Sequence, residues 1–348
     1  MRLFNKLLLF TLAPLLGLGI TVYAFASDTT DLLLPVETTG SSVTALCNHF
    51  NSIYESMGYI ANTAETLETQ YKQQEDTLGQ LNEEVAEQKQ LSDEIYEQRI
   101  LAMLGPPIKE HKSSRVEMKV FQLDELGYRG YIAKVKLFDP TALKVVLAED
   151  TLGKKETTLE AVKRTGAIFG INGGGFYTEM RDGESYAVHM GNVIINGKLI
   201  TPFNPYPENI FFAGINSRGK FIGGIFYELP ELMAQDPWQG VSFLPVLIKG
   251  GMSRPIDSEW KLTKHPRTIV GEYANGDLIF IVVDGRQSDW SSGVTLERLL
   301  DKLVELGVKE GYNLDGGGST TFVYDGKILN RPSDGKARPV VTNFIIMP

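Results

Sequence analysis

The sequence predicts a mixed α/β (α+β) domain, built on a pseudo-symmetric mixed sheet, that follows a transmembrane helix and a long helical stalk. Three observations predict this organisation. A charge-free apolar run lies near the start, an acidic stretch with heptad spacing follows it, and short β-branched segments separated by Gly pairs fill the rest. The 348 residues, 43% of them hydrophobic, are enough for a large core.

The first 26 residues predict a membrane anchor or a signal peptide. Arg2 and Lys6 precede the run 7–26, which contains no charged residue. A run of this length is just enough to cross a bilayer as a helix, and the basic flank keeps the N-terminus cytoplasmic. The run ends in Ala24-Phe25-Ala26, which also fits signal-peptidase cleavage. We therefore expect the remaining chain to be extracytoplasmic, held by a single membrane span or secreted after cleavage.

Residues 27–47 are rich in Ser, Thr and Asp and predict a linker, whereas residues 48–104 predict one long helix. This helix holds eleven acids and three bases, most of the net charge of −9. Apolar or small residues recur there in steps of three and four, with Gln74 in the one gap. They are Ile53, Met57, Ile60, Ala64, Leu67, Tyr71, Leu78, Leu81 and Val85. The spacing indicates either a coiled-coil homodimer or a helix that packs on its own domain.

Charge and cysteine content exclude two further features. Most of the excess negative charge lies in the predicted stalk, and no basic face is present that would indicate nucleic-acid binding. Cys47 is the only cysteine, so an internal disulfide is excluded. We expect a free thiol there, with a bridge to another copy as the alternative.

Gly105-Pro106-Pro107 predicts the end of the helix and the start of a domain over residues 108–348. Strands are expected at 131–138 and 144–148, and helices at 157–165 and 295–306. Dipeptides typical of hairpin turns occur at Asn196-Gly197, Asn275-Gly276 and Asp325-Gly326.

One pattern occurs twice in this domain. Thr158-Leu159-Glu160 opens a helix that precedes a strand and the sequence Asn172-Gly173-Gly174-Gly175. Thr295-Leu296-Glu297 opens a second helix that precedes a strand and Asp315-Gly316-Gly317-Gly318. Chance similarity of two α/β units is one interpretation. The other is a pair of half-domains whose glycine loops meet at one site.

A crossover connection places two acids together. Residues 277–283 predict an apolar strand that ends at Asp284, and the helix 295–306 then leads to a strand that ends at Asp315. Strand, helix and strand in this order should give two parallel strands of one sheet, so both acids should lie at the same edge. Asn172, at the end of a third strand, would add to this polar cluster.

Several types of chemistry fit such a cluster. Arg267, Arg286, Arg331 and Arg338 lie near this edge in the sequence, and Arg suits bidentate phosphate binding. His189 follows the first glycine loop and is a candidate general acid, or a structural histidine. Oxygen atoms of Asp284, Asp315 and Asn172 would also suit Ca²⁺ or Mg²⁺. An acid before three glycines is also typical of a simple tight turn.

The motifs together resemble the phosphodiester glycosidase family. They are Ile171–Tyr177, Pro266-Arg267-Thr268, Asp284-Gly285-Arg286, Asn313–Thr321 and the segment 330–340, in this order. The resemblance covers about residues 110–348. It implies an exported, membrane-anchored bacterial hydrolase that cleaves a sugar-1-phosphodiester, similar to N-acetylglucosamine-1-phosphate, in cell-surface polysaccharide or a related glycan.

The resemblance also implies roles for residues. Asp315 is the expected catalytic carboxylate, with Asp284 as a second carboxylate or positioning group, and Arg267, Arg286 and Arg338 bind phosphate. The other implied binding positions are Asn172, Gly173, Gly174, Gly316, Gly317, Gly318, Ser319 and Thr320. No cofactor follows from this chemistry. Thr178 stands where the family often has Asp, which favours the alternative of a non-catalytic scaffold that binds envelope polysaccharide.

Overall fold

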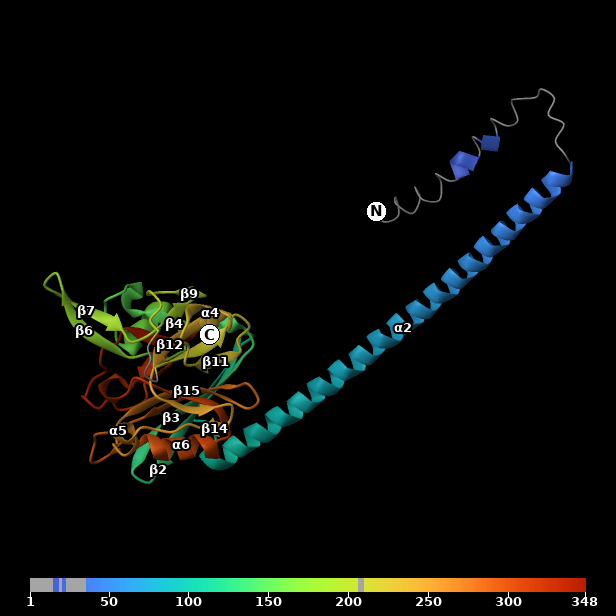
Figure 1. Ribbon diagram of the computed structural model, residues 1–348. Coiled ribbons are helices and arrows are strands. Elements are labelled where there is room, and N and C mark those ends of the chain that lie inside the picture. Colours follow the sequence, from blue (N-terminus) through green and yellow to red (C-terminus); the bar gives the residue numbers. More distant parts are fainter. Residues whose placement is uncertain (1–14, 19–20, 23–35, 206–209) are drawn as a thin grey trace. The chain divides into compact units, whose positions relative to one another are not determined.

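A computed structural model describes residues 15–18, 21–22, 36–205 and 210–348 (Figure 1). Most of the expected membrane run 1–26 lies outside these residues, as does the segment 27–35. Within the described residues, no helix is both long and apolar enough to cross a membrane. The chain divides between Val85 and Ala86 into two compact units.

Helix α2 extends over Val36–Leu104, a length of 69 residues. The predicted linker 27–47 is therefore corrected, because its described residues from Val36 onward are helical. The heptad spacing continues upstream through Phe50 and Leu46 to Val43, so it outweighs the Ser and Thr content of this segment. Helix α2 ends as predicted, at Gly105, which has a φ of +75° and donates its N–H to the Leu101 carbonyl at 2.9 Å.

The largest sheet has eight strands in the order β1-β2-β3-β16-β15-β17-β13-β14. Its strands are β1 (Lys109–Lys112), β2 (Val116–Glu125), β3 (Tyr128–Leu137), β13 (Val246–Lys249), β14 (Met252–Ser253), β15 (Arg267–Tyr273), β16 (Leu278–Val283) and β17 (Val308–Leu314). Neighbouring strands are antiparallel, which corrects the expected mixed sheet. Because β15 separates β16 from β17 and is antiparallel to both, those two strands still run in the same direction, as the crossover predicted.

Three smaller sheets complete the domain. One has the order β11-β10-β12-β8-β9, another β19-β18-β5-β20-β4, and β6 pairs with β7 alone. Their strands are β4 (Leu143–Leu147), β5 (Phe169–Asn172), β6 (Phe176–Arg181), β7 (Glu184–His189), β8 (Ile194–Ile195), β9 (Lys198–Leu199), β10 (Phe211–Asn216), β11 (Phe221–Gly224), β12 (Pro237–Phe243), β18 (Phe322–Tyr324), β19 (Lys327–Ile328) and β20 (Thr342–Ile346). The turns at Asn196-Gly197 and Asp325-Gly326 have positive φ at both residues and close hairpins, as predicted.

The helices of the domain are short. They are α3 (Thr158–Thr165), α4 (Leu229–Met233), α5 (Ser258–Lys261) and α6 (Leu296–Glu305), with single 3₁₀ turns η1 (Pro140–Ala142), η2 (Ala148–Asp150) and η3 (Gly317–Ser319). Thr157 caps α3 in a capping box with Glu160, and Thr295 caps α6. The repeated helix, strand and glycine-loop order is therefore present, but its two copies lie in different sheets.

The eight-stranded sheet is buried on both faces. Along β16, Phe280 and Val282 contribute to a core shared with the two five-stranded sheets, whereas Ile279 and Ile281 contribute to a core with α6. This alternation follows from the period of two along a strand, and it explains why β16 is apolar throughout. Figure 1 shows α6 and the last turns of α2 together on this second face.

Ion pairs and one buried side chain fix the last turns of α2 to the domain. Glu97 pairs with Lys119 at 2.6 Å and with Lys134 at 3.2 Å, and Asp93 pairs with Lys136. Ile100 is fully buried in the core with α6. The helix segment from residue 93 therefore packs on its own domain, which is one of the two arrangements expected for the stalk.

Candidate active site

Three predicted site residues lie at one end of adjacent strands. Arg267 begins β15, and Asp284 and Asp315 directly follow the flanking strands β16 and β17. The first two residues of β15 lie opposite Val283 and Leu314, so the three strand ends are level. The two acids therefore emerge at one edge of the sheet on either side of the arginine.

Asp315 is a half-buried carboxylate with a perturbed pKa. Burial raises its pKa above the usual value for Asp, and the nearby Ser319 side chain, the Gly316 N–H and the charge of Arg338 oppose this shift in part. The buried Ser319 hydroxyl has no hydrogen-bond partner of ordinary geometry within the described residues. A carboxyl group with a raised pKa beside a cation is typical of a reactive site.

Arginine side chains lie directly on the glycine loop that follows Asp315. A Cβ atom on Gly317 would lie 3.1 Å from Nη2 of Arg286, and one on Gly318 would lie 2.1 Å from Nη2 of Arg338. Gly317 also has a φ of +61°, which disfavours other residues. Guanidinium groups thus occupy the space next to Gly317 and Gly318, whereas the Pro266 carbonyl lies next to Gly316.

Three backbone amides at this loop bond to backbone carbonyls. The Gly317 N–H donates to the Pro266 carbonyl at 3.0 Å, and the amides of Ser319 and Thr320 donate back to Gly316 and Gly317. The last two of these bonds close the loop into the 3₁₀ turn η3. The binding roles of Gly316, Gly317 and Gly318 stay a prediction. The guanidinium groups of Arg286 and Arg338, which lie at this loop, are candidates for binding an anion.

Arg267 is a buried cation without a carboxylate partner among the described residues. Its side chain donates to the carbonyls of Thr263 at 3.0 Å and Val294 at 3.5 Å, and the residue is only 3% exposed. Burial, together with the nearby charge of Arg286, lowers the pKa of Arg267 to about 10. A bound anion would offset the unfavourable burial of this charge.

The other two arginines are exposed, so a ligand can reach them. Nη2 of Arg286 lies 3.3 Å from Nδ1 of His265, and the Arg286 backbone has a φ of +62°. Nη2 of Arg338 donates to Asp334 at 2.9 Å. The hydrogen bond from Arg338 lowers the pKa of Asp334, and the charge of Arg286 adds to this effect, so the three residues form one charged group above the loop.

Asp284 is a fully hydrogen-bonded anchor. Its carboxylate accepts from Nε1 of Trp290 at 2.8 Å, from Nδ2 of Asn330 at 2.9 Å and from the Arg331 N–H at 3.0 and 3.1 Å. Burial raises the pKa of Asp284, and these N–H donors oppose the rise. The geometry fits the expected positioning role rather than direct attack, since both oxygens already have donors.

Asn172 connects the two halves of the domain. Its Nδ2 donates to the Asp315 carbonyl at 2.6 Å, and its Oδ1 accepts from the Thr268 hydroxyl at 2.9 Å and the Thr321 N–H at 3.2 Å. The Thr268 hydroxyl also lies 3.5 Å from that of Thr320. Asn172 is fully buried, and its side chain holds the Asp315 backbone in place.

The first glycine loop is closely packed against neighbouring strands. The Gly173 N–H donates to the Thr342 carbonyl at 2.8 Å, and the Gly174 N–H donates to the Thr342 hydroxyl at 3.2 Å. Cβ atoms on these glycines would approach Thr342 Oγ1 to 2.5 Å and the Ser242 carbonyl to 2.6 Å. Strand packing therefore uses the amides of Gly173 and Gly174 and the space beside them, so these two N–H groups are not free to bind an anion.

His189 is buried at the end of β7, where it lies opposite Phe176. Neither ring nitrogen has a hydrogen-bond partner within the described residues, and burial lowers the pKa of His189 to about 4. No hydrogen bond among these residues connects the His189 ring with Asp315. The role of His189 as a general acid stays a prediction.

Several residues at this edge were not predicted from the sequence. His265 contacts Arg286, Asn330 holds Asp284, and Asp334 pairs with Arg338. All three lie in irregular segments, where periodicity carries no signal. The tail motif that begins at Asn330 was the one available indication.

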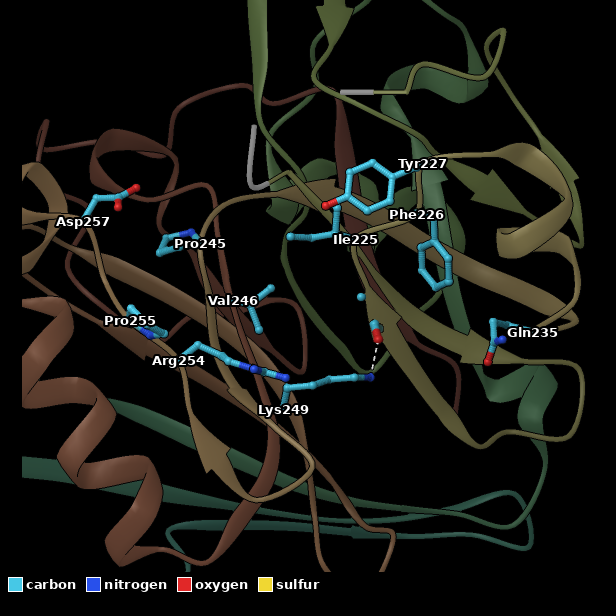
Figure 2. Close-up of a pocket in the computed structure, with 12 residues that line it drawn as sticks. Ile225, Phe226, Tyr227, Gln235, Pro245, Val246, Lys249, Arg254, Pro255 and Asp257 are labelled. Atoms are coloured by element: carbon cyan, nitrogen blue, oxygen red, sulfur yellow. Dashed lines mark hydrogen bonds between the residues drawn. The ribbon is translucent and has the colours of Figure 1, made fainter. Parts of the chain in front are cut away.

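A separate pocket of about 720 Å³ lies along β13. Figure 2 shows Phe226 and Tyr227 on one wall and Arg254 on another, with Lys249 reaching the Gly223 carbonyl. The size is ordinary for a small-molecule site. Its lining includes neither Asp315 nor the three arginines, so it is distinct from the residues of the Asp315 cluster.

Comparison with known proteins identifies the domain that carries this cluster. The family model described as phosphodiester glycosidase matches residues 165–347, more than half of the chain. The chain belongs to the phosphodiester glycosidase family. The match includes both glycine loops, Asp284, Asp315 and the three arginines of this phosphodiester glycosidase domain.

Relatives and a solved structure agree with this membership. The chain is 30% identical over 200 residues to the SPbeta prophage-derived uncharacterized protein YomE of Bacillus subtilis, covering 55% of this chain and 30% of that protein. It is 28% identical over 197 residues to bovine (Bos taurus) N-acetylglucosamine-1-phosphodiester alpha-N-acetylglucosaminidase, covering 52% of this chain and 36% of the bovine protein. The zebrafish catalytic domain of that enzyme, auto-inhibited by its pro-peptide, matches with a TM-score of 0.55 and 25% identity over 70% of this chain and 87% of the zebrafish chain. The chain thus spans about a third of the length of these two curated relatives.

Proposed function

We propose that this phosphodiester glycosidase is an exported hydrolase that cleaves a sugar-1-phosphodiester, similar to N-acetylglucosamine-1-phosphate, in cell-surface polysaccharide or a related glycan. The observation that carries the proposal is the placement of Asp315 beside Arg286 and Arg338 at the edge where Arg267 is buried. A sugar-1-phosphodiester presents an anionic phosphate next to a carbon that becomes cationic when its bond breaks. The bovine relative is named for such a substrate.

In the proposed reaction, the arginines hold the phosphate. Arg286 and Arg338 bind its non-bridging oxygens above the second glycine loop, and Arg267 adds positive charge from the sheet edge. Because the phosphate departs readily as an anion, the reaction needs little help from a general acid. This is why the mechanism does not require His189.

Asp315 then acts at the sugar. As the bond between the anomeric carbon and the phosphate oxygen breaks, its electron pair passes to that oxygen, and the carboxylate stabilises the developing oxocarbenium ion. Water adds to the anomeric carbon and gives up a proton, so the products are a free sugar and a phosphomonoester. Asp284 and Asn172 act as positioning residues. Asp284 holds Asn330 in the C-terminal segment, and Asn172 holds the backbone of Asp315.

A direct assay tests the proposal. Purified full-length chain should release free sugar from an alkyl-phospho-N-acetylglucosamine or from UDP-N-acetylglucosamine. Asp315→Asn should lower kcat by at least about 10³-fold with little change in thermal unfolding, because it removes the carboxylate charge and preserves the shape. The matched control is Asp325→Asn in the turn between β18 and β19, which should keep full activity.

The same assay also tests the alternative function, that of a non-catalytic scaffold. If a panel of sugar-1-phosphodiesters yields no turnover while the protein still binds envelope polysaccharide, the non-catalytic scaffold is the better description. Wild-type turnover by Asp315→Asn would instead leave the hydrolase in place and overturn the role of its carboxylate.

The proposed location rests on the sequence near the start. Arg2 and Lys6 before the charge-free run 7–26 support a single span with the catalytic domain outside the cytoplasm. Cys47 lies on the exposed surface of α2 and provides a probe. A membrane-impermeant maleimide should label Cys47 in intact cells, and Cys47→Ser should remove the label. Labelling only after lysis would place the domain in the cytoplasm.

A further inference from the structure

We propose that residues 43–85 of α2 form a parallel, in-register, two-stranded coiled coil with a second copy of the chain. The proposal concerns an interaction surface outside the phosphodiester glycosidase domain and is independent of the reaction. It rests on the spacing, exposure and charge of side chains along this part of the helix.

An unbroken heptad seam follows one stripe of the helix. Thirteen positions alternate in steps of three and four from Val43 to Val85, and Ala64 and Gln74 are the only two without a large apolar side chain. The other eleven are Val43, Leu46, Phe50, Ile53, Met57, Ile60, Leu67, Tyr71, Leu78, Leu81 and Val85. A seam sustained at a mean spacing of 3.5 residues keeps facing one partner only if the helices supercoil around each other.

No part of the described chain buries the seam side chains. Its eleven large apolar side chains are between 48% and 70% exposed. Exposed apolar side chains occur singly on ordinary surfaces, but a continuous stripe of this length marks an interface. A single helix also gains most of its stability from packing of such a face rather than from its own backbone.

The seam ends where packing on the domain begins. The next two heptad positions are polar, Gln88 and Ser92. Directly after them, Asp93 and Glu97 form ion pairs with lysines of the large sheet, and Ile100 enters the core. The two arrangements expected for the stalk therefore apply to different parts of one helix: the last turns pack on their own domain, and residues 43–85 are left for a partner.

Charge along the seam fits a second, parallel copy. The acids of this segment lie beside or opposite the seam and never within it. In heptad notation the seam residues alternate between a and d positions, and Val43 is an a position. In a parallel pair, the g residue directly before each a position faces the e residue five places further along the other helix. These pairs are Ser42 with Cys47, His49 with Tyr54, Ser56 with Ala61, Thr63 with Glu68, Gln70 with Glu75, Thr77 with Asn82, and Glu84 with Lys89. No pair repels, and Glu84 attracts Lys89 of the second copy.

Molecular mass tests the proposal on the full chain. Purified in mild detergent, the protein component should have twice the chain mass of 38.6 kDa by light scattering corrected for detergent. Ile60→Asp combined with Leu67→Asp buries charge in the seam and should give the single-chain mass. The matched control, Asn62→Asp with Thr69→Asp, adds the same charges on the opposite face and should keep the doubled mass.

Cysteine cross-linking tests direction and register. In a Cys47→Ser background, Leu46→Cys should form a disulfide between copies under mild oxidation, because residues at this position face each other in a parallel pair. Asp76→Cys, on the outer face, should not. A single-chain mass for the wild type, a tripled mass, an unchanged mass for the seam variant, or failure of Leu46→Cys to cross-link would each overturn the proposal.

Discussion

The two glycine loops of the domain have three consecutive glycines after a polar residue, yet different neighbours require them. At Gly174, a Cβ atom would collide with the Ser242 backbone carbonyl at 2.6 Å. At Gly318, it would collide with the end of the Arg338 side chain at 2.1 Å. The motif therefore marks strand packing in the first half and a charged, accessible site in the second. What lies above the loop, rather than the glycines themselves, decides its function.

Among single substitutions that compare the two halves, replacing an arginine should have the largest effect on activity. Arg286→Gln should lower kcat/KM for a sugar-1-phosphodiester by about 10²-fold, because it removes a charged donor to the phosphate in the transition state. Arg181→Gln, in β6 after the first loop, is the matched control. Arg181 is exposed and pairs with Glu179, so its loss should leave kcat/KM unchanged. Equal losses in both variants would contradict the division between the loops.

The glycines themselves give the second comparison. Gly174→Ala should lower the free energy of unfolding by about 2 kcal/mol, since backbone and Val241 surround the new methyl group. Its activity per folded molecule should not change. Gly318→Ala should cost less stability, because the flexible Arg338 side chain can move, but should raise KM several-fold by displacing that charge. Denaturant unfolding and steady-state kinetics on both variants measure the stability loss and the change in KM. A raised KM in Gly174→Ala but not in Gly318→Ala would contradict the prediction.

Much of this comparison was accessible from the sequence. The strand, helix and strand order around α6 predicted that Asp284 and Asp315 would emerge at the same edge, and the level strand ends of β16 and β17 confirm it. The two Thr-Leu-Glu segments also located α3 and α6 correctly, and the hairpin dipeptides located the turns. These features depend on local patterns, which a sequence displays directly.

The remaining features depend on contacts between distant segments. Nothing local shows that β15 inserts between β16 and β17, that Asn330 binds Asp284 across 46 residues, or that Ser242 approaches Gly174. The glycine pattern alone therefore gave both loops the same role. Among the described residues, tertiary contacts occupy both carboxylate oxygens of Asp284 and the side-chain oxygen of Asn172, and they give Arg267 no carboxylate partner.

The pH dependence of folding stability gives a third comparison, because His189 and the two acids Asp284 and Asp315 change stability in opposite directions. Burial lowers the pKa of His189 to about 4, from an ordinary value near 6.5. Between these values the unfolded chain binds a proton that the folded chain does not, so stability falls as pH drops from 6.5 to 4, by up to roughly 3 kcal/mol. The raised pKa values of Asp315 and Asp284 act in the opposite direction. His189→Gln should therefore lose less stability than wild type over this window in denaturant titrations, and parallel pH profiles would show that His189 is protonated in the fold.

The smallest expected effect is that of chelation. A cation shared by Asn172, Asp284 and Asp315 would need free oxygen lone pairs, but N–H donors occupy both Asp284 oxygens, and Thr268 and Thr321 bond Oδ1 of Asn172. The amide of Asn172 instead holds the second loop directly through the Asp315 carbonyl. Hydrolysis should therefore survive exhaustive EDTA treatment within the error of the assay. If EDTA abolishes turnover and Ca²⁺ or Mg²⁺ restores it, the arginines are not the only positive charges at the site, and Asp315 acts at least in part as a metal ligand.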